Sequence, residues 1–191
     1  LSERLSDVTA VTVDPGALFD LNNFNETIGS LAGGILLPGT DPSQYGLVTL
    51  GAGNLRTGGN GTSTLFAGRV NGTGTVTKLV NGTWTLLNTN TFAGAFLISA
   101  GTVVMGDSSS GVLASAVPNV TTNVTVASGA RLTGDGRIQG NVTINSGATL
   151  TPNNPLVPEP LDIDGDLTML AGSTYIMNIG DQLLYSRMTV S

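Results

Sequence analysis

The sequence predicts an all-β protein built as a parallel β-solenoid, in which short strands stack rung upon rung. Three observations predict this fold. Apolar and polar residues alternate over short stretches, as in strands with one buried face. A strand–glycine unit recurs along the chain, and stretches that favour a helix are few. At 191 residues, 40% of them hydrophobic, the chain is long enough to form one domain, residues 1–191, with a substantial core.

The recurring unit reads apolar, any residue, apolar, two residues, glycine, two residues, apolar. It centres on Gly16, Gly101, Gly129, Gly147 and Gly172, and Gly53 lies in a unit that lacks only the last position. Each glycine is expected to supply a turn in which φ is free to be positive. The gaps between these glycines, 18 to 48 residues, fit one or two coils of about 20 to 25 residues. The chain would then make about eight rungs and a rod about 40 Å long.

Between these units the sequence predicts little else. Residues 25–31 and 107–116 favour a helical turn or two, although both contain glycine. The proline-containing stretches 38–46 and 151–160 are expected to be loops that interrupt the rungs. No linker divides the chain into two domains.

Composition excludes several function classes. The net charge is −6, Lys78 is the only lysine, and the six arginines are scattered, so we expect no nucleic-acid binding. No apolar stretch is long enough to span a bilayer as a helix, and residues 1–10 lack the pattern of a signal peptide. Cysteine and histidine are absent, which removes disulfides, thiolate nucleophiles and the commonest general base. We expect no cofactor and no enzymatic activity.

Residues 74–106, GTVTKLVNGTWTLLNTNTFAGAFLISAGTVVMG, resemble the passenger-associated transport repeat of autotransporter proteins. That repeat runs as a lysine-containing strand, Gly-Thr-(Trp/Leu)-Thr-Leu, an Asn-Thr-aromatic turn that ends in glycine, and an apolar strand that ends in Ala-Gly-Thr. The matching positions include Lys78, Gly82, Trp84, Leu86, Asn90, Phe92, Gly94, Ile98 and Gly101. Gly94-Ala95-Phe96 replaces the usual Gly-Gly-Thr, so the outward face of the next strand is expected to be apolar.

The resemblance implies a right-handed parallel β-helix that serves as the non-enzymatic stalk of a secreted or surface-displayed passenger domain. Its export would use an outer-membrane translocation barrel, which this sequence does not contain, so the chain is expected to be a segment of a longer passenger or a mature piece released from one. Stepwise folding of the β-helix would support export, and the stalk would support display or adhesion. The expected location is extracellular or the bacterial cell surface, with a host or matrix surface as a further partner.

A second hypothesis is a subunit of an extracellular filament. A solenoid has two ends with unpaired strand edges, and stacking head to tail would cover both. The apolar residues expected at the two ends are Val8, Val11 and Val13, and Leu183, Leu184, Met188 and Val190. End-to-end self-association is therefore expected. A carbohydrate-active β-helix enzyme is a third hypothesis.

Four features of the sequence have a structural and a functional interpretation. Trp84 shares a strand face with Leu86, which favours the core over a sugar-stacking platform. Asp162, Asp164 and Asp166 alternate, which favours one solvated strand face with Ile163 inward over a calcium loop. Asp135 and Asp166 are candidates for the acid and base of a glycosidase, but a turn explains Asp135.

The fourth feature is a set of Asn-x-Ser/Thr sequences, which are acceptors for glycans in a suitable secretory system. They begin at Asn25, Asn60, Asn71, Asn81, Asn119, Asn123 and Asn141. We interpret these asparagines first as stacked turn residues.

Overall fold

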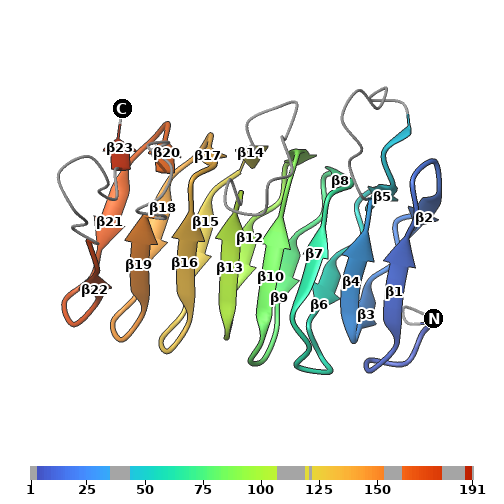
Figure 1. Ribbon diagram of the computed structural model, residues 1–191, viewed down its shortest axis with the longest axis horizontal. Coiled ribbons are helices and arrows are strands. Elements are labelled where there is room, and N and C mark those ends of the chain that lie inside the picture. Colours follow the sequence, from blue (N-terminus) through green and yellow to red (C-terminus); the bar gives the residue numbers. More distant parts are fainter. Residues whose placement is uncertain are drawn as a thin grey trace, which may run out of the picture.

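The computed structural model describes residues 4–34, 44–106, 119–120, 122–152, 161–177 and 188–190. These residues form strands and turns, and no α-helix occurs among them. The strands build three sheets in which every pair of neighbours is parallel. They follow one another along the long axis of the molecule, from the N-terminus at one end to the C-terminus at the other (Figure 1). The all-β class and the parallel stacking expected from the sequence are confirmed.

The three sheets are named here A, B and C. Sheet A consists of β1 (Ala10–Val13), β4 (Ser30–Gly33), β7 (Thr64–Phe66), β10 (Thr83–Leu86), β13 (Thr102–Met105), β16 (Arg131–Gly134), β19 (Thr149–Pro152) and β22 (Thr174–Tyr175). Sheet B consists of β2 (Leu18–Asp20), β5 (Leu47–Thr49), β8 (Arg69–Gly72), β11 (Thr89–Phe92), β14 (Asn119–Val120), β17 (Arg137–Ile138), β20 (Leu161–Ile163) and β23 (Met188–Val190). Sheet C consists of β3 (Glu26–Ile28), β6 (Leu55–Thr57), β9 (Val76–Lys78), β12 (Phe96–Ile98), β15 (Val124–Val126), β18 (Val142–Ile144) and β21 (Leu167–Met169).

Consecutive strands belong to sheets A, B and C in turn, so each sheet takes every third strand. We call three consecutive strands, one from each sheet, a triplet, and we name the A–B, B–C and C–A corners after the sheets that they connect. Hydrogen bonds between neighbouring triplets join residues from 18 apart, as at Asn123 and Asn141, to 34 apart, as at Gly33 and Ala67. This variable length contributes to the irregular glycine spacing in the sequence, as does the position of the glycine units at different corners.

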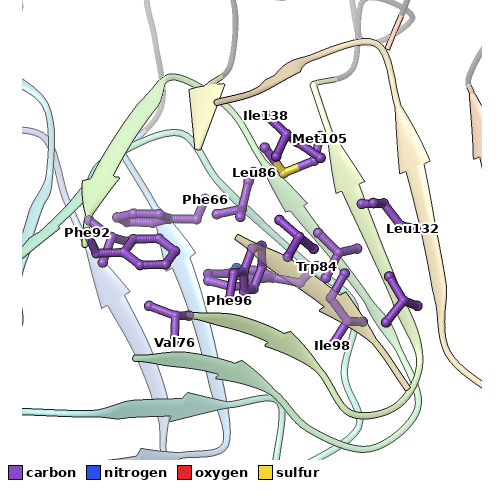
Figure 2. Packing of buried hydrophobic residues seen from close by; sticks show 14 of the residues in the cluster. Phe66, Val76, Trp84, Leu86, Phe92, Phe96, Ile98, Met105, Leu132 and Ile138 are labelled. Atoms are coloured by element: carbon purple, nitrogen blue, oxygen red, sulfur yellow. The ribbon is translucent and has the colours of Figure 1, made fainter. Parts of the chain in front are cut away.

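One face of each strand points into the space between the sheets. In β10, Trp84 and Leu86 are buried whereas Thr83 and Thr85 are half-buried, as the alternation predicts. The inward residues stack in columns, because the strand register pairs Trp84 with Val103 and Val103 with Leu132. They form one continuous apolar cluster, part of which is seen in Figure 2.

Glycines at the corners have two different physical roles. Gly101, Gly129 and Gly147 have φ between +72° and +77°, the left-handed conformation that a turn after an alternating strand requires. Gly53 does not have positive φ but lies against the preceding triplet, where a Cβ would overlap the carbonyl oxygen of Phe24. At the same point of the B–C corner, a Cβ on Gly74 would overlap Gly53 O, and one on Gly94 would overlap Gly74 O. This stacked column of glycines lets the backbones of neighbouring triplets approach closely.

The helical turn expected at residues 25–31 is wrong. These residues belong to β3 and β4, which pair with β6 and β1, because Thr27 and Ile28 suit a strand and the neighbouring triplets supply hydrogen-bond partners. The other expected helical turn, 107–116, lies outside the described residues, as do residues 38–43 and 153–160 of the two proline-containing stretches. No helix in the described part of the chain is long and apolar enough to cross a membrane.

Apolar residues were expected to be exposed at both ends of the stack, and this is only partly so. Val8 is exposed, but Val11 packs against the core and Val13 is buried, so only the first of the three lies free. The buried carboxylate of Glu26 accepts hydrogen bonds from the backbone N–H groups of Arg4 and Leu5, at 3.0 and 2.9 Å.

At the other end of the stack, Met188 packs against the core and Val190 is exposed. Residues 183 and 184 lie outside the described residues.

Candidate functional site

Residues 74–106, which carry the resemblance to the transport repeat, form the five strands β9 to β13 near the middle of the stack (Figure 1). The residues that match the repeat are divided between two environments. Lys78, Trp84, Leu86, Asn90, Phe92 and Ile98 are buried, and Gly82, Gly94 and Gly101 occupy corners. The residues that match the repeat therefore lie in the interior or at corners, and few of their side chains reach solvent.

The three sheets each contribute one aromatic ring to the centre of this region. Trp84 comes from sheet A, Phe92 from sheet B and Phe96 from sheet C. Phe96 meets both other rings edge to face, with centroid distances of 6.1 Å to Trp84 and 5.8 Å to Phe92 (Figure 2). Such T-shaped pairs stabilise a core beyond the apolar area that they bury.

This cluster corrects one expectation for β12. Phe96 was expected to make the outward face of the strand apolar, but it is fully buried. The alternation of β12 places Phe96 and Ile98 inward and leaves Leu97 half-buried on the outside. The aromatic residue in place of threonine thus fills the interior.

Trp84 is only 2% exposed, so no sugar ring can stack on its face. Its indole Nε1–H is also buried and has no hydrogen-bond partner among the described residues. An unpaired buried donor costs about 1 to 3 kcal/mol, which the packing of the ring must offset. The surroundings of Trp84 are those of a core residue.

Lys78 occupies an inward position of sheet C, in register with Thr57 and Ile98. Its ammonium group bends toward the C–A corner, where Nζ donates hydrogen bonds to the carbonyl oxygens of Leu79 and, at 2.8 Å, Val80. Burial lowers the pKa of Lys78 below its usual 10.5. Val80 has a positive φ of 24°, an unusual conformation for a β-branched residue that turns its carbonyl toward the lysine. The lysine thus holds a corner together.

Asn90 holds the A–B corner in a similar way. It is fully buried, its Oδ1 accepts a hydrogen bond from the Val70 N–H at 3.0 Å, and its Nδ2 donates to Asn88 O at 3.2 Å. One asparagine therefore satisfies backbone groups on two triplets, which accounts for an amide in an otherwise apolar interior.

Asparagines also form a ladder at the B–C corner. Asn25 Oδ1 accepts a hydrogen bond from the backbone N–H of Asn54, and Asn54 Oδ1 accepts one from Thr75, at 2.9 and 2.8 Å. Further along the stack, Asn123 Oδ1 accepts from the Asn141 N–H and Asn141 Oδ1 from the Asp166 N–H. Three of the Asn-x-Ser/Thr asparagines, Asn25, Asn123 and Asn141, are therefore stacked turn residues.

The alternating aspartates do not share one strand face. β20 ends at Ile163, which is buried, and the chain bends at Asp164 and Gly165 before β21. Asp164 Oδ2 forms an ion pair with Arg137, whose Nε donates a hydrogen bond to it at 2.8 Å, while Asp166 is exposed beyond the bend. Within the described residues no group of three or more acidic side chains is placed to hold a metal ion.

The two aspartates weighed as a glycosidase pair lie at different corners. Asp135 follows β16 at an A–B corner, whereas Asp166 precedes β21 at a B–C corner. A glycosidase needs two carboxyl groups that flank one bond. Asp135 at an A–B corner and Asp166 at a B–C corner are therefore not placed to flank one glycosidic bond.

A cavity of about 520 Å³ lies on the outer face of sheet B near the N-terminal half of the stack. Its lining includes Leu18 of β2, Leu47 of β5, Arg69 of β8 and Thr89 of β11, together with Tyr45. Sequence reasoning missed this cavity. Arg69 appeared only as one of six scattered arginines and Tyr45 only within an expected loop, and no local pattern links them.

Comparison of the chain with protein-family models, with curated proteins and with solved structures gave no match.

Proposed function

We propose that the chain is a non-enzymatic stalk segment of a secreted or surface-displayed autotransporter-like protein. In this proposal each triplet is one rung of a single right-handed β-helix of about eight rungs. The observation that carries the proposal is the interior of residues 74–106. The residues that match the transport repeat there fill a continuous apolar core or form tight corners, and none presents a catalytic group.

Local burial supports a role in export. Each strand pairs only with the strands three before and three after it, so a new triplet can pack as soon as the one beside it is formed. A chain that emerges unfolded through an outer-membrane barrel would fold triplet by triplet, and each step would bury apolar surface outside the cell. Display or adhesion would then depend on the outer surface of the stack and on neighbouring segments.

The experiment joins the chain to a heterologous secretion signal and translocation barrel and measures display by protease treatment of whole cells. Gly94→Val is the test variant, because a side chain at Gly94 would overlap Gly74 O and prevent this triplet from packing against the preceding one. Ala95→Val is the matched control, because Ala95 is the exposed neighbour. We expect display to fall strongly for Gly94→Val and to stay at the parent level for Ala95→Val. Parent-level display of a Gly94→Val chain that is unfolded by circular dichroism would contradict the proposal.

A filament subunit is the second candidate, and the exposed apolar residues near the last strands favour it. Met169, Leu170, Ile176, Met177 and Val190 are each between 37% and 52% exposed, on or next to β21, β22 and β23. These are the outermost strands of the three sheets among the described residues. A second copy of the chain would cover them by continuing the stack.

Light scattering across a concentration series, with electron microscopy, separates the two candidates. A filament subunit gives long fibres and a mass that rises with concentration, and Val190→Lys weakens the association because it places a charge at the contact. A stalk segment gives discrete rods. A parent chain that stays monomeric at millimolar concentration would eliminate the filament.

A further inference from the structure

The outer face of sheet B carries a cavity that is lined by one positively charged side chain, Arg69. Leu18, Leu47 and Arg69 are in register on β2, β5 and β8, and their neighbours Val48 and Val70 point into the core. Arg69 therefore projects outward beside two leucines, at the base of the cavity of about 520 Å³. That volume lies within the range of small-molecule sites.

The guanidinium of Arg69 is fixed in place by Tyr45. Its central carbon lies 4.6 Å from the centroid of the Tyr45 ring, a cation–π contact. The ring itself is 7% exposed and packs in a small separate cluster with Ala67 and Leu87. Because both planar groups are held before any ligand arrives, binding to Arg69 would order few groups.

Arg69 also has unused hydrogen-bonding capacity. Its Nε is buried and has no hydrogen-bond partner, and no carboxylate in the described part of the chain forms an ion pair with it. The other arginine on the outer face of sheet B, Arg137, is paired with Asp164. Because Nε is buried, a ligand in the cavity would pair with the terminal N–H groups of the guanidinium, and a carboxylate is the group whose geometry matches them.

Apart from Gly16 and Ala17, the remaining lining is polar without charge. Asn71 is in register with Thr91, and Thr89 lies two residues earlier on the same strand, so one amide and two hydroxyl groups line the cavity beside Arg69. The lining contains no acidic residue. Hydroxyls and amides are suited to a ligand that itself has several hydroxyl groups, and the two leucines offer an apolar surface for a ring face.

We propose that this cavity binds a carboxylate-bearing saccharide, such as a short chain of uronic acid residues. The sugar carboxylate pairs with Arg69, its hydroxyls bond to Asn71, Thr89 and Thr91, and its ring lies against Leu18 and Leu47. An acidic peptide fits less well. Acidic motifs are usually recognised by clusters of arginines, whereas the cavity lining holds only Arg69, and of the strands that line it only β2 leaves an edge to which an extended peptide could add.

The test measures binding of tri-galacturonate to the folded chain by calorimetry, with the neutral methyl ester of the same sugar as the comparison. We expect the acid to bind and the ester to bind at least tenfold more weakly. Arg69→Gln should weaken binding of the acid at least tenfold, and Arg137→Gln, on the same outer face, should leave it unchanged. Circular dichroism confirms that both variants are folded.

Three results would overturn the proposal. The first is a parent chain that does not bind the acid at all. The second is equal weakening by Arg69→Gln and Arg137→Gln, which would reveal only a general attraction of an anion to positive charge. The third is tighter binding of a tripeptide of glutamate residues than of tri-galacturonate, which would assign the cavity to acidic peptides. None of these results depends on whether the chain is a stalk.

Discussion

Truncation of Trp84 tests whether the aromatic cluster holds the stack together. A buried tryptophan replaced by alanine costs about 3 to 5 kcal/mol of unfolding free energy, and Trp84 is 2% exposed, so the full packing loss applies. The variant also loses the edge-to-face contact with Phe96, and such a pair contributes about 0.5 to 1.5 kcal/mol beyond the burial of apolar area. The packing loss should therefore lie in the upper part of that range. Removal of the unpaired indole N–H returns about 1 kcal/mol. We therefore expect Trp84→Ala to lose about 3 to 4 kcal/mol.

Trp84→Phe should lose much less, about 1 to 2 kcal/mol, because it keeps an aromatic ring against Phe96 and removes the same unpaired donor. Thr85→Ala is the matched control on the outer side of β10 and should change stability by less than about 1 kcal/mol. Urea unfolding followed by far-ultraviolet circular dichroism is the assay, since Trp84 is the only tryptophan and its fluorescence is lost. A Trp84→Ala variant within about 1 kcal/mol of the parent would refute the packing argument.

Three further predictions concern the corners and the charged groups. Gly74→Ala should prevent stable folding, because the new Cβ would overlap Gly53 O. Gly129→Ala should cost only about 1 to 2 kcal/mol of stability, because Gly129 has a φ of +77° but open space around it. Thermal melts compare the two variants. Burial lowers the pKa of Lys78, so the folded state binds its proton less tightly than the unfolded state. The parent should therefore gain stability relative to Lys78→Met as the pH rises toward 10.5. Urea unfolding of both proteins across this pH range measures the effect, and a constant difference between their midpoints would contradict it. Removal of calcium with EDTA should leave the melting temperature unchanged, because Asp164 is paired with Arg137; a drop that calcium restores would reveal a metal site.

The strands and their inward faces could be predicted from the sequence. In a strand, successive side chains point to opposite sides, so the short alternations around Trp84 and Leu86 are enough to assign the buried face. A glycine that follows such an alternation predicts a turn, because glycine adopts positive φ at little cost. Gly101 and Gly147 lie at such turns and have positive φ. For the candidate site, the resemblance of residues 74–106 to a known repeat grouped Trp84, Leu86, Phe92 and Ile98, and these side chains are buried in one apolar cluster.

The pairing of strands depends on the tertiary structure. The glycine units that look alike in the sequence lie in different sheets: the one before Gly16 is in sheet A, the one before Gly53 in sheet B and the one before Gly101 in sheet C. The distance between paired residues also varies, because loops of different length join the same corners. Local alternation contains no information about which triplet a strand will contact.

The cavity on sheet B and the asparagine ladder arise from that pairing. Tyr45 and Arg69 belong to neighbouring triplets and meet only because β5 and β8 are in register, and Asn123 reaches Asn141 only across one turn of the chain. The sequence by itself determined the strands, their buried faces and many of their turns, because these depend on residues close together in the chain. The tertiary structure decided which polar side chains meet, because each such contact joins residues about one triplet apart, and the register between triplets is set by the packing of the whole interior.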